Sequence, residues 1–175
     1  MKDYFSILQI PLSFRPDLDQ LKKQYYKLSR ANHPDHFTMQ GDAAQEAALL
    51  ASGDINVAYK VLSDEQARLS YLLHFLEILK DSEHEVLPQE FLMEIMEINE
   101  AVFDLEMDYD EAKRNATISD IENKKNELAD DLNKGIDMFE NQENRGEALQ
   151  IIKENFLKMK YMLRIQENIS TFASP

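Results

Sequence analysis

A helical rhythm of apolar residues stops abruptly before Pro34. Apolar side chains recur every three to four residues, as on one face of an α-helix: Leu18, Leu21, Tyr25 and Leu28. Pro16 is a common helix-start residue, and the pattern predicts a helix over residues 17–32. Pro34 lacks a backbone N–H and pushes His33 out of the helical region, so a loop must begin there.

A second helical stripe follows this loop: Ala47, Ala51, Ile55, Ala58 and Leu62, widened by Leu50, Val57 and Val61. Two long helices that pack through apolar faces across a short loop form an antiparallel hairpin. We therefore expect His33, Pro34 and Asp35 at the tip of a helical hairpin. Gly53 within the second helix costs about 1 kcal/mol relative to alanine, and the sequence does not explain its presence.

The pattern divides the chain into two domains. After Ser63 and Asp64, which are suited to cap a third helix, helical spacing continues to Leu79 and then breaks. A polar, acidic segment follows, and Pro88 is suited to the first position of a new helix. Two further stripes are Ile118, Ile121, Leu128, Leu132, Ile136 and Phe139, then Leu149, Ile152, Phe156, Met159 and Leu163. The predicted organisation is a domain over residues 1–79, a linker over 80–87, and a three-helix bundle over 88–172.

Composition favours an all-α fold and limits the chemistry. Only 4 Gly and 5 Pro among 175 residues favour long helices over many short strands. The formal charge of −14 opposes binding to nucleic acid or to an anionic membrane surface. The chain has no cysteine for a disulfide or a thiolate metal site, and no apolar run long enough to span a bilayer. We expect no cofactor and no metal.

The helix before the loop carries a local excess of positive charge. Its cationic residues are Lys22, Lys23, Lys27 and Arg30. In so acidic a chain this face indicates a contact with an acidic partner, and an ordinary solvated helix face is the alternative.

The helix predicted to begin at Pro88 has more apolar residues than its bundle needs. Phe91, Ile95, Ile98 and Val102 share one sector, whereas Leu92, Met96 and Phe103 lie in another, next to Met93, Glu97, Glu100 and Asp104. A second apolar sector with an acidic rim is typical of a partner-binding surface. Burial of Leu92 and Met96 beneath the linker or the first domain is the alternative.

An enzymatic function would have to use His33, Asp35 and His36 as a hydrolase dyad or as metal ligands. Three such groups within four residues of one loop have no fixed ligand geometry by themselves. No nucleophile or phosphate-binding glycine loop accompanies them. We therefore do not expect an enzyme.

Several motifs in the first domain resemble a J-domain, in order and at its spacing. They are Tyr4-Phe5 with Leu8, the stretch 25–28, the tripeptide His33-Pro34-Asp35, and the stretch 55–64. The rest of the chain is similar to the HscB family of J-domain co-chaperones, through Arg68 and Tyr71 before the linker and Phe91-Leu92-Met93-Glu94 after it. The resemblance covers nearly the whole chain.

This resemblance implies a co-chaperone that is not itself an enzyme. In J-domains the tripeptide stimulates the ATPase of a heat-shock 70 kDa-type chaperone, HscA or DnaK-like, which implies that role for His33, Pro34 and Asp35 beside the basic face. The HscB family delivers an IscU-like iron–sulfur scaffold to this chaperone. The matching scaffold positions are Leu92, Met93, Met96, Glu97, Glu100, Asp104 and Tyr161. The family also implies two units in a roughly L-shaped arrangement.

The sequence differs from related proteins at His36 and in the segments that it lacks. His36 stands where the HscB family usually has lysine, which removes a permanent charge from the loop. A general J-domain co-chaperone for unfolded clients is the alternative, although the glycine- and phenylalanine-rich linker and the cysteine-rich zinc modules of such proteins are missing. The cysteine-bearing N-terminal segment of the animal relatives is also missing, so we expect the bacterial, cytoplasmic form.

Overall fold

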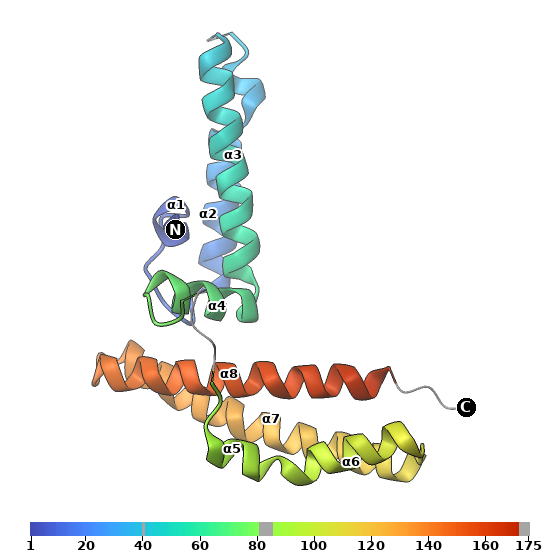
Figure 1. The fold of residues 1–175 in the computed structure, drawn as a ribbon. Coiled ribbons are helices and arrows are strands. Elements are labelled where there is room, and N and C mark those ends of the chain that lie inside the picture. Colours follow the sequence, from blue (N-terminus) through green and yellow to red (C-terminus); the bar gives the residue numbers. More distant parts are fainter. Residues whose placement is uncertain (40, 81–85, 172–175) are drawn as a thin grey trace. The chain divides into compact units, whose positions relative to one another are not determined.

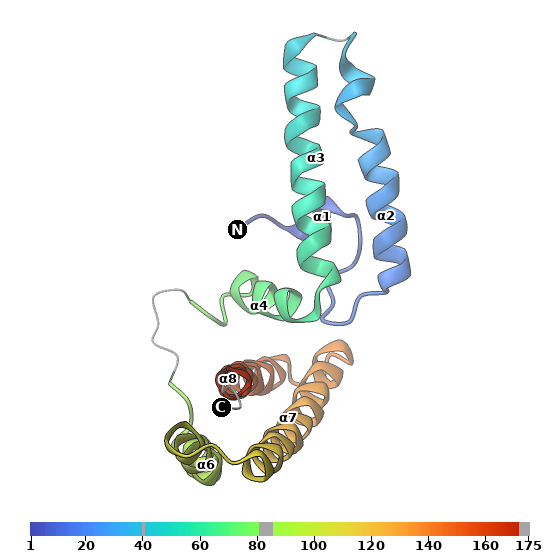
Figure 2. The same ribbon diagram turned by 90° about the vertical axis from the view of Figure 1, so that its right-hand side faces the viewer.

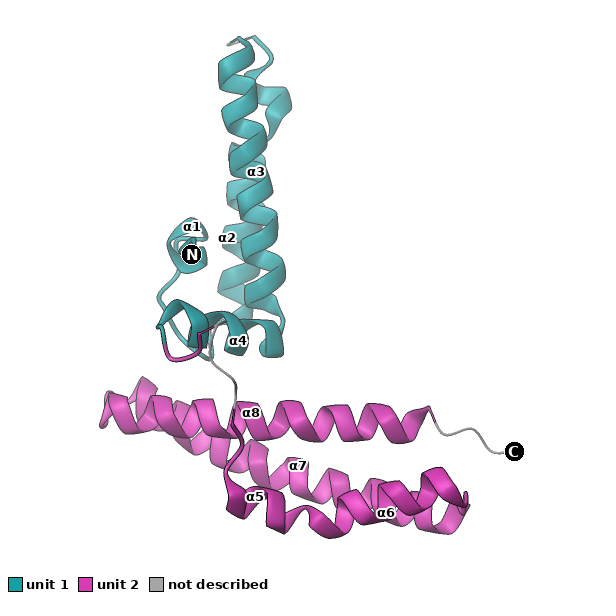
Figure 3. Ribbon diagram, viewed as in Figure 1, with its two compact units in different colours: residues 1–77 teal, residues 78–175 magenta. Residues whose placement is uncertain are grey.

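The computed structural model describes residues 1–39, 41–80 and 86–171. Every regular element in these ranges is helical, which confirms the predicted all-α class (Figure 1). The chain separates into two compact units, Met1–Glu77 and Ile78–Pro175 (Figure 3). The predicted linker falls largely on residues 81–85, outside the described residues. The predicted domain limits and the L-shaped arrangement stay predictions.

The first unit is built on the predicted hairpin. Helices α2 (Leu18–Ala31) and α3 (Asp42–Ser63) lie side by side in both ribbon views (Figures 1 and 2). The Asp17 carboxylate fixes the start of α2, because it accepts hydrogen bonds from the backbone N–H groups of Asp19 and Gln20 at 2.9 and 3.1 Å. The helices are joined through a 3₁₀ turn, η1 (Pro34–Phe37), where the sequence predicted a loop.

Two shorter helices pack against the hairpin, α1 (Tyr4–Ile7) along its side and α4 (Glu65–Phe75) at its base (Figures 1 and 2). Helix α1, which the sequence analysis did not predict, is capped by Asp3, and α4 is capped by Asp64 as expected. The Tyr71 hydroxyl donates to the carbonyl oxygen of Lys2 at 3.0 Å and accepts from the backbone N–H of Tyr4 at 2.9 Å. This side chain therefore ties the N-terminal segment to α4.

A buried arginine links three segments of the first unit. The Arg68 side chain is 6% exposed, and it donates from Nε to the carbonyl oxygen of Phe14 at 3.0 Å and from Nη1 to that of Leu62 at 2.6 Å. Burial lowers the pKa of its guanidinium, although the carboxylates of Glu65 and Asp64 favour its charge. Arg68 thus connects the segment before α2 with the end of α3.

The apolar stripe predicted for α3 is partly wrong. Ile55, Ala58 and Leu62 are buried, but Ala47 is exposed and so are Leu50 and Val57. The helix packs against α2 on one side and α1 on another, and these contacts cover a narrower sector than the apolar pattern suggested.

The second unit is a bundle around two long helices, α7 (Glu111–Glu140) and α8 (Arg145–Ser170) (Figure 3). In α8 the most deeply buried positions include Ala148, Asn155, Met162 and Ile169, which recur every seven residues. Such a repeat is typical of coiled-coil packing between helices. The predicted stripe of α8 is correct at Ile152 and Phe156, which are buried. Further along the helix it is wrong by one residue, because Met162 lies in the core and Leu163 is only half-buried.

Helices α7 and α8 lie close together at Gly135. A Cβ atom placed on this glycine would lie 2.9 Å from Cγ2 of Ile151 and 3.1 Å from Cγ1 of Ile152. Gly135 is itself buried, so its missing side chain is what allows the two backbones to come together.

The helix predicted to start at Pro88 is two helices, α5 (Gln89–Glu94) and α6 (Met96–Met107). The break is at Ile95, whose φ of −96° and ψ of 9° leave the helical region and whose side chain is fully buried. No proline or glycine marks this position, so the sequence carried no local signal of it. The predicted core residues Phe91, Ile95 and Val102 do pack into the bundle.

Candidate functional site

The His33 side chain helps to fix the conformation of the tripeptide at the hairpin tip. His33 has the extended backbone that Pro34 requires, with φ −69° and ψ 127°, and its Nδ1 accepts a hydrogen bond from the backbone N–H of Asp35 at 3.3 Å. A neutral imidazole that accepts at Nδ1 carries its proton on Nε2. The cap therefore leaves His33 with one N–H donor for a partner.

The Asp35 carboxylate stands next to this ring and remains open to solvent. Its Oδ2 lies 3.6 Å from Nδ1 of His33, and the side chains are 82% and 55% exposed, respectively. The backbone carbonyl of Asp35 accepts a hydrogen bond from the Thr38 hydroxyl at 3.1 Å, which fixes the turn beyond it. An exposed carboxylate on a fixed turn is well placed to pair with a cationic group of a partner.

The predicted basic face lies on the exposed side of α2. Lys22, Lys23, Lys27 and Arg30 are all exposed. All but Lys22 line one shallow hollow, which they share with Tyr26. The sequence analysis missed Tyr26, although its spacing from Lys23 and Arg30 places it on their helix face. Because Arg30 is in the last turn of α2, the basic face continues to the tripeptide.

An aromatic contact holds the hairpin together beneath this face. The rings of Tyr25 and Tyr59 stack with centroids 4.1 Å apart, and the Tyr25 hydroxyl donates to Oδ1 of Asn56 at 3.1 Å. These contacts cross from α2 to α3 and so fix the orientation of the basic side chains that follow on α2.

The second predicted surface lies on α5 and α6. Leu92, Met93 and Met96 are 41%, 67% and 54% exposed, so the core of their own unit does not cover them. Glu97, Glu100 and Asp104 are also exposed. Phe103 and Met107 extend the apolar surface along α6, and Met107 was missed because it is the last residue of that helix.

Tyr161 differs from its predicted position opposite the apolar stripe of α8. It is half-buried and packs against the core at its edge, with its ring nearly perpendicular to that of Phe91 at a centroid distance of 6.2 Å. Its hydroxyl donates to Oδ1 of Asn99 at 3.4 Å. The seven-residue repeat explains the difference, because it turns Met162 into the core and carries its neighbour Tyr161 to the core's edge.

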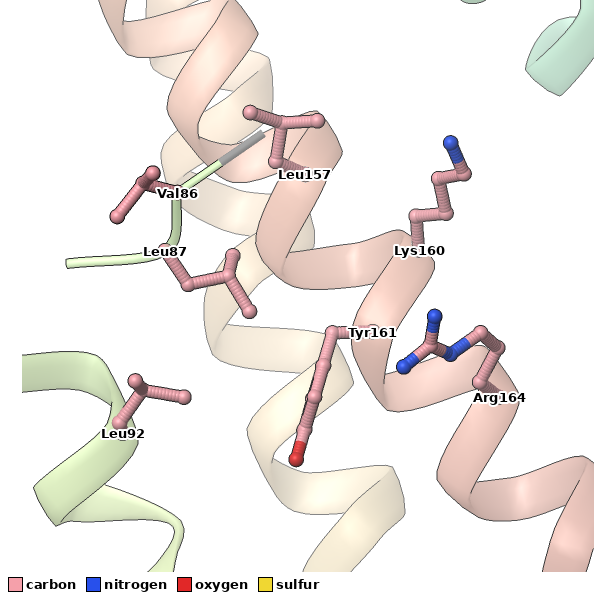
Figure 4. A pocket seen from close by; sticks show the side chains of 7 residues that line it. All are labelled: Val86, Leu87, Leu92, Leu157, Lys160, Tyr161 and Arg164. Atoms are coloured by element: carbon pink, nitrogen blue, oxygen red, sulfur yellow. The ribbon is translucent and has the colours of Figure 1, made fainter. Parts of the chain in front are cut away.

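Tyr161 and Leu92 meet at an open hollow of about 450 Å³ (Figure 4). Its lining residues are Val86, Leu87, Leu92, Leu157, Lys160, Tyr161 and Arg164. The other predicted residues of this surface, from Met93 to Asp104, do not line it. The structure therefore places two of the predicted residues at a hollow and the rest on the helices beside it.

Within the described ranges no cluster of three or more His, Cys, Asp and Glu side chains could hold a metal ion. Among the same residues, no helix combines the length and the apolar character needed to cross a membrane.

Comparison with known proteins assigns both units. A DnaJ domain model matches residues 3–71, and a model described as the HSCB C-terminal oligomerisation domain matches residues 87–170. Human iron–sulfur cluster co-chaperone protein HscB is 32% identical over 170 residues, which cover 96% of this chain and 67% of the human one. This chain belongs to the HscB family of J-domain co-chaperones. The resemblance predicted from the motifs is thereby confirmed.

Other HscB proteins agree in sequence and fold. An HscB homolog of Neisseria meningitidis serogroup B is 32% identical over 135 residues, covering 77% of each chain. The crystal structure of human HscB superposes with a TM-score of 0.69 at 32% identity, covering 97% of this chain and 81% of that one. HscB from Vibrio cholerae, at 23% identity, has the same fold with a TM-score of 0.64, covering 97% and 96% of the two chains.

Proposed function

We propose that this HscB protein binds a heat-shock 70 kDa-type chaperone through its first unit and an iron–sulfur cluster scaffold through its second. It stimulates the ATPase of the chaperone, HscA or DnaK-like, and delivers the IscU-like scaffold to it. The observation that carries the proposal is the fixed, exposed His33-Pro34-Asp35 turn next to a basic face, in a chain that exposes a separate apolar surface.

The chaperone contact combines shape and charge. Pro34 and the His33 cap limit the conformations of the turn, so less entropy is lost when a partner orders it. The Nε2 proton of His33 and the Asp35 carboxylate offer one donor and one charged acceptor. Lys23, Lys27 and Arg30 add long-range attraction to an acidic chaperone surface. The chain itself performs no bond chemistry in this scheme, since ATP is hydrolysed by the chaperone.

The scaffold contact uses the second unit. Leu92, Met93 and Met96 supply exposed apolar area, and methionine side chains adapt readily to the shape of a partner. Glu97, Glu100 and Asp104 form an acidic rim that favours a scaffold with a basic border. The proposed setting is the bacterial cytoplasm, and the Neisseria relative is a bacterial member of the same family.

The experiment that separates this function from that of a general co-chaperone measures chaperone ATPase at steady state. The chaperone is assayed alone, with this protein, with the IscU-type scaffold of the same genome, and with both. We expect stimulation by this protein alone and a larger, more than additive stimulation with both. Equal stimulation by the scaffold and by an unfolded model client would favour the general co-chaperone.

A further inference from the structure

The polar lining of the hollow at Tyr161 is cationic. Lys160 and Arg164 line it from α8, and its other lining residues within the described part of the chain are apolar or aromatic. Figure 4 shows the Arg164 guanidinium turned toward the Tyr161 ring and the Lys160 side chain extending away from it, with Leu87 and Leu92 on the other side of the ring. In a chain with a net charge of −14, most of the surface repels anions. A guanidinium at an apolar hollow favours an anionic group of a partner at this place.

Arg164 is oriented by Tyr161. Its Cζ atom lies 5.5 Å from the centroid of the Tyr161 ring, and Tyr161 is in turn held by Phe91 and Asn99. A guanidinium carries its N–H donors in one plane, where they match the two oxygens of a carboxylate, and a neighbouring ring limits the positions that it takes. The cation is therefore partly preorganised for binding an acid.

The surface next to the hollow has the opposite charge. Leu92 belongs both to the hollow and to the exposed apolar row that continues through Met96 along α6. Glu97, Glu100 and Asp104 lie along that helix, away from the hollow. The surface thus has a positive end at Arg164 and a negative end on α6, joined by apolar residues.

We propose that the hollow binds an apolar side chain of the scaffold that has an Asp or Glu carboxylate next to it. The apolar side chain packs between Leu92, Leu157 and Tyr161, and the carboxylate pairs with Arg164. Basic residues of the scaffold then face the acidic rim of α6. The two ends fix the direction in which the scaffold segment lies, because reversing it would bring like charges together. This inference rests on the proposed scaffold binding.

The test measures binding of the recombinant IscU-type scaffold by calorimetry to the full-length chain and to Arg164→Gln, Lys160→Gln and Lys134→Gln variants. Lys134 is a matched control, because it is an exposed lysine of α7 that does not line the hollow. We expect Arg164→Gln to raise Kd by about tenfold, Lys160→Gln by less, and Lys134→Gln hardly at all. Scaffold carboxylates are then neutralised one at a time in a double-mutant cycle with Arg164→Gln.

The possible outcomes separate the two proposals. The orientation is supported if neutralising one scaffold carboxylate raises Kd for the wild type but not for the Arg164→Gln variant. If Leu92→Ala weakens binding while Arg164→Gln and Lys160→Gln leave Kd within twofold of the wild type, the carboxylate site is wrong and scaffold binding stands. If the unmodified chain does not bind the scaffold, both proposals are wrong. Thermal unfolding of each variant shows whether a loss reflects a disturbed Tyr161.

Discussion

The imidazole Nδ1 of His33 caps the turn that it belongs to, through the backbone N–H of Asp35 at 3.3 Å. One ring nitrogen thus has a structural role, and the other is left for recognition. Asparagine is a strong helix-capping residue that can take over the first role, but it does not place a donor where Nε2 lies.

We therefore expect His33→Asn to keep the melting temperature of the wild type and to abolish stimulation of the chaperone ATPase. His33→Ala would lose both the cap and the donor. Asp35→Asn keeps the size of the side chain and removes its charge, and it should also abolish stimulation without unfolding the unit. Circular dichroism and a steady-state ATPase assay measure the two effects. Full stimulation by His33→Asn and Asp35→Asn would contradict the assigned role of the turn.

Charge reversal on the basic face should weaken chaperone binding in a salt-dependent way. Lys23→Glu with Lys27→Glu changes two cations of one hollow, and we expect mainly a slower association rate. The difference from the wild type should shrink as the Debye length falls from about 10 Å at 0.1 M salt to about 3 Å at 1 M. Lys60→Glu, on the exposed surface of α3, is the control. A salt-independent loss would point to a folding defect instead.

Truncation of the exposed apolar row should weaken scaffold binding and leave stability unchanged. Leu92→Ala with Met96→Ala removes side chains that are about half exposed, so the free energy of unfolding should change by less than about 0.5 kcal/mol per site. Val102→Ala, a buried change on α6, the helix that carries Met96, should lower the stability instead. Calorimetry with the scaffold and thermal denaturation distinguish the two. A large loss of stability in the double variant would mean that the row is part of a core.

Two glycines in helices should respond in opposite ways to alanine. A Cβ at Gly53 would meet no atom within 4 Å, so Gly53→Ala should stabilise the first unit by about 1 kcal/mol. At Gly135 the added methyl group would lie 2.9 Å from Ile151, and overpacking should destabilise the second unit by about 1–3 kcal/mol. Chemical denaturation of both variants tests this contrast. If Gly53→Ala also lowers chaperone stimulation, the open backbone at Gly53 is needed by the partner.

The first unit should lose stability in alkali through Tyr71. Burial raises the pKa of its hydroxyl above the usual tyrosine value of 10.0, although the hydrogen bond from the backbone N–H of Tyr4 partly offsets this. The folded state keeps the proton that the unfolded state releases, so this contribution is complete below pH 10 and is lost as pH rises through the folded pKa. Tyr71→Phe should lower stability at pH 7 and flatten its decline above pH 10. Parallel curves for both proteins would exclude Tyr71 as the cause.

Local signals in the sequence predicted some helix ends, and tertiary contacts decided others. Pro34 and the caps at Asp17 and Asp64 act within a few residues, so the limits of α2 and the start of α4 were predictable. The break at Ile95 has no such signal, because it depends on how Phe91 and Val102 fit the same core from two helices. The exposed Leu50 shows the converse, since an apolar pattern does not reveal how much of a helix its neighbours cover.

Of the candidate site, the sequence predicted the surfaces that lie on one helix and missed the hollow that two helices form. Exposed single-helix patterns, such as Lys23 with Lys27 on α2 or Glu97 with Glu100 on α6, follow from helix periodicity alone. The hollow does not, because Arg164 and Leu92 are far apart in sequence and meet only when α8 packs beside α5. Tyr161 was assigned from the family resemblance, and its place at the edge of the core depends on the repeat that joins α7 and α8.

The break at Ile95 gives the hollow walls of unequal stiffness. Tyr161 belongs to α8, a helix of 26 residues that packs along α7. Leu92 belongs to α5, a helix of six residues that ends before Ile95. Short helices open at lower free energy than long packed ones, so backbone amides of α5 should exchange with solvent sooner than those around Tyr161. If the scaffold changes shape as it gains or loses its cluster, Leu92 on α5 can move with it. Tyr161 on α8 would stay in place.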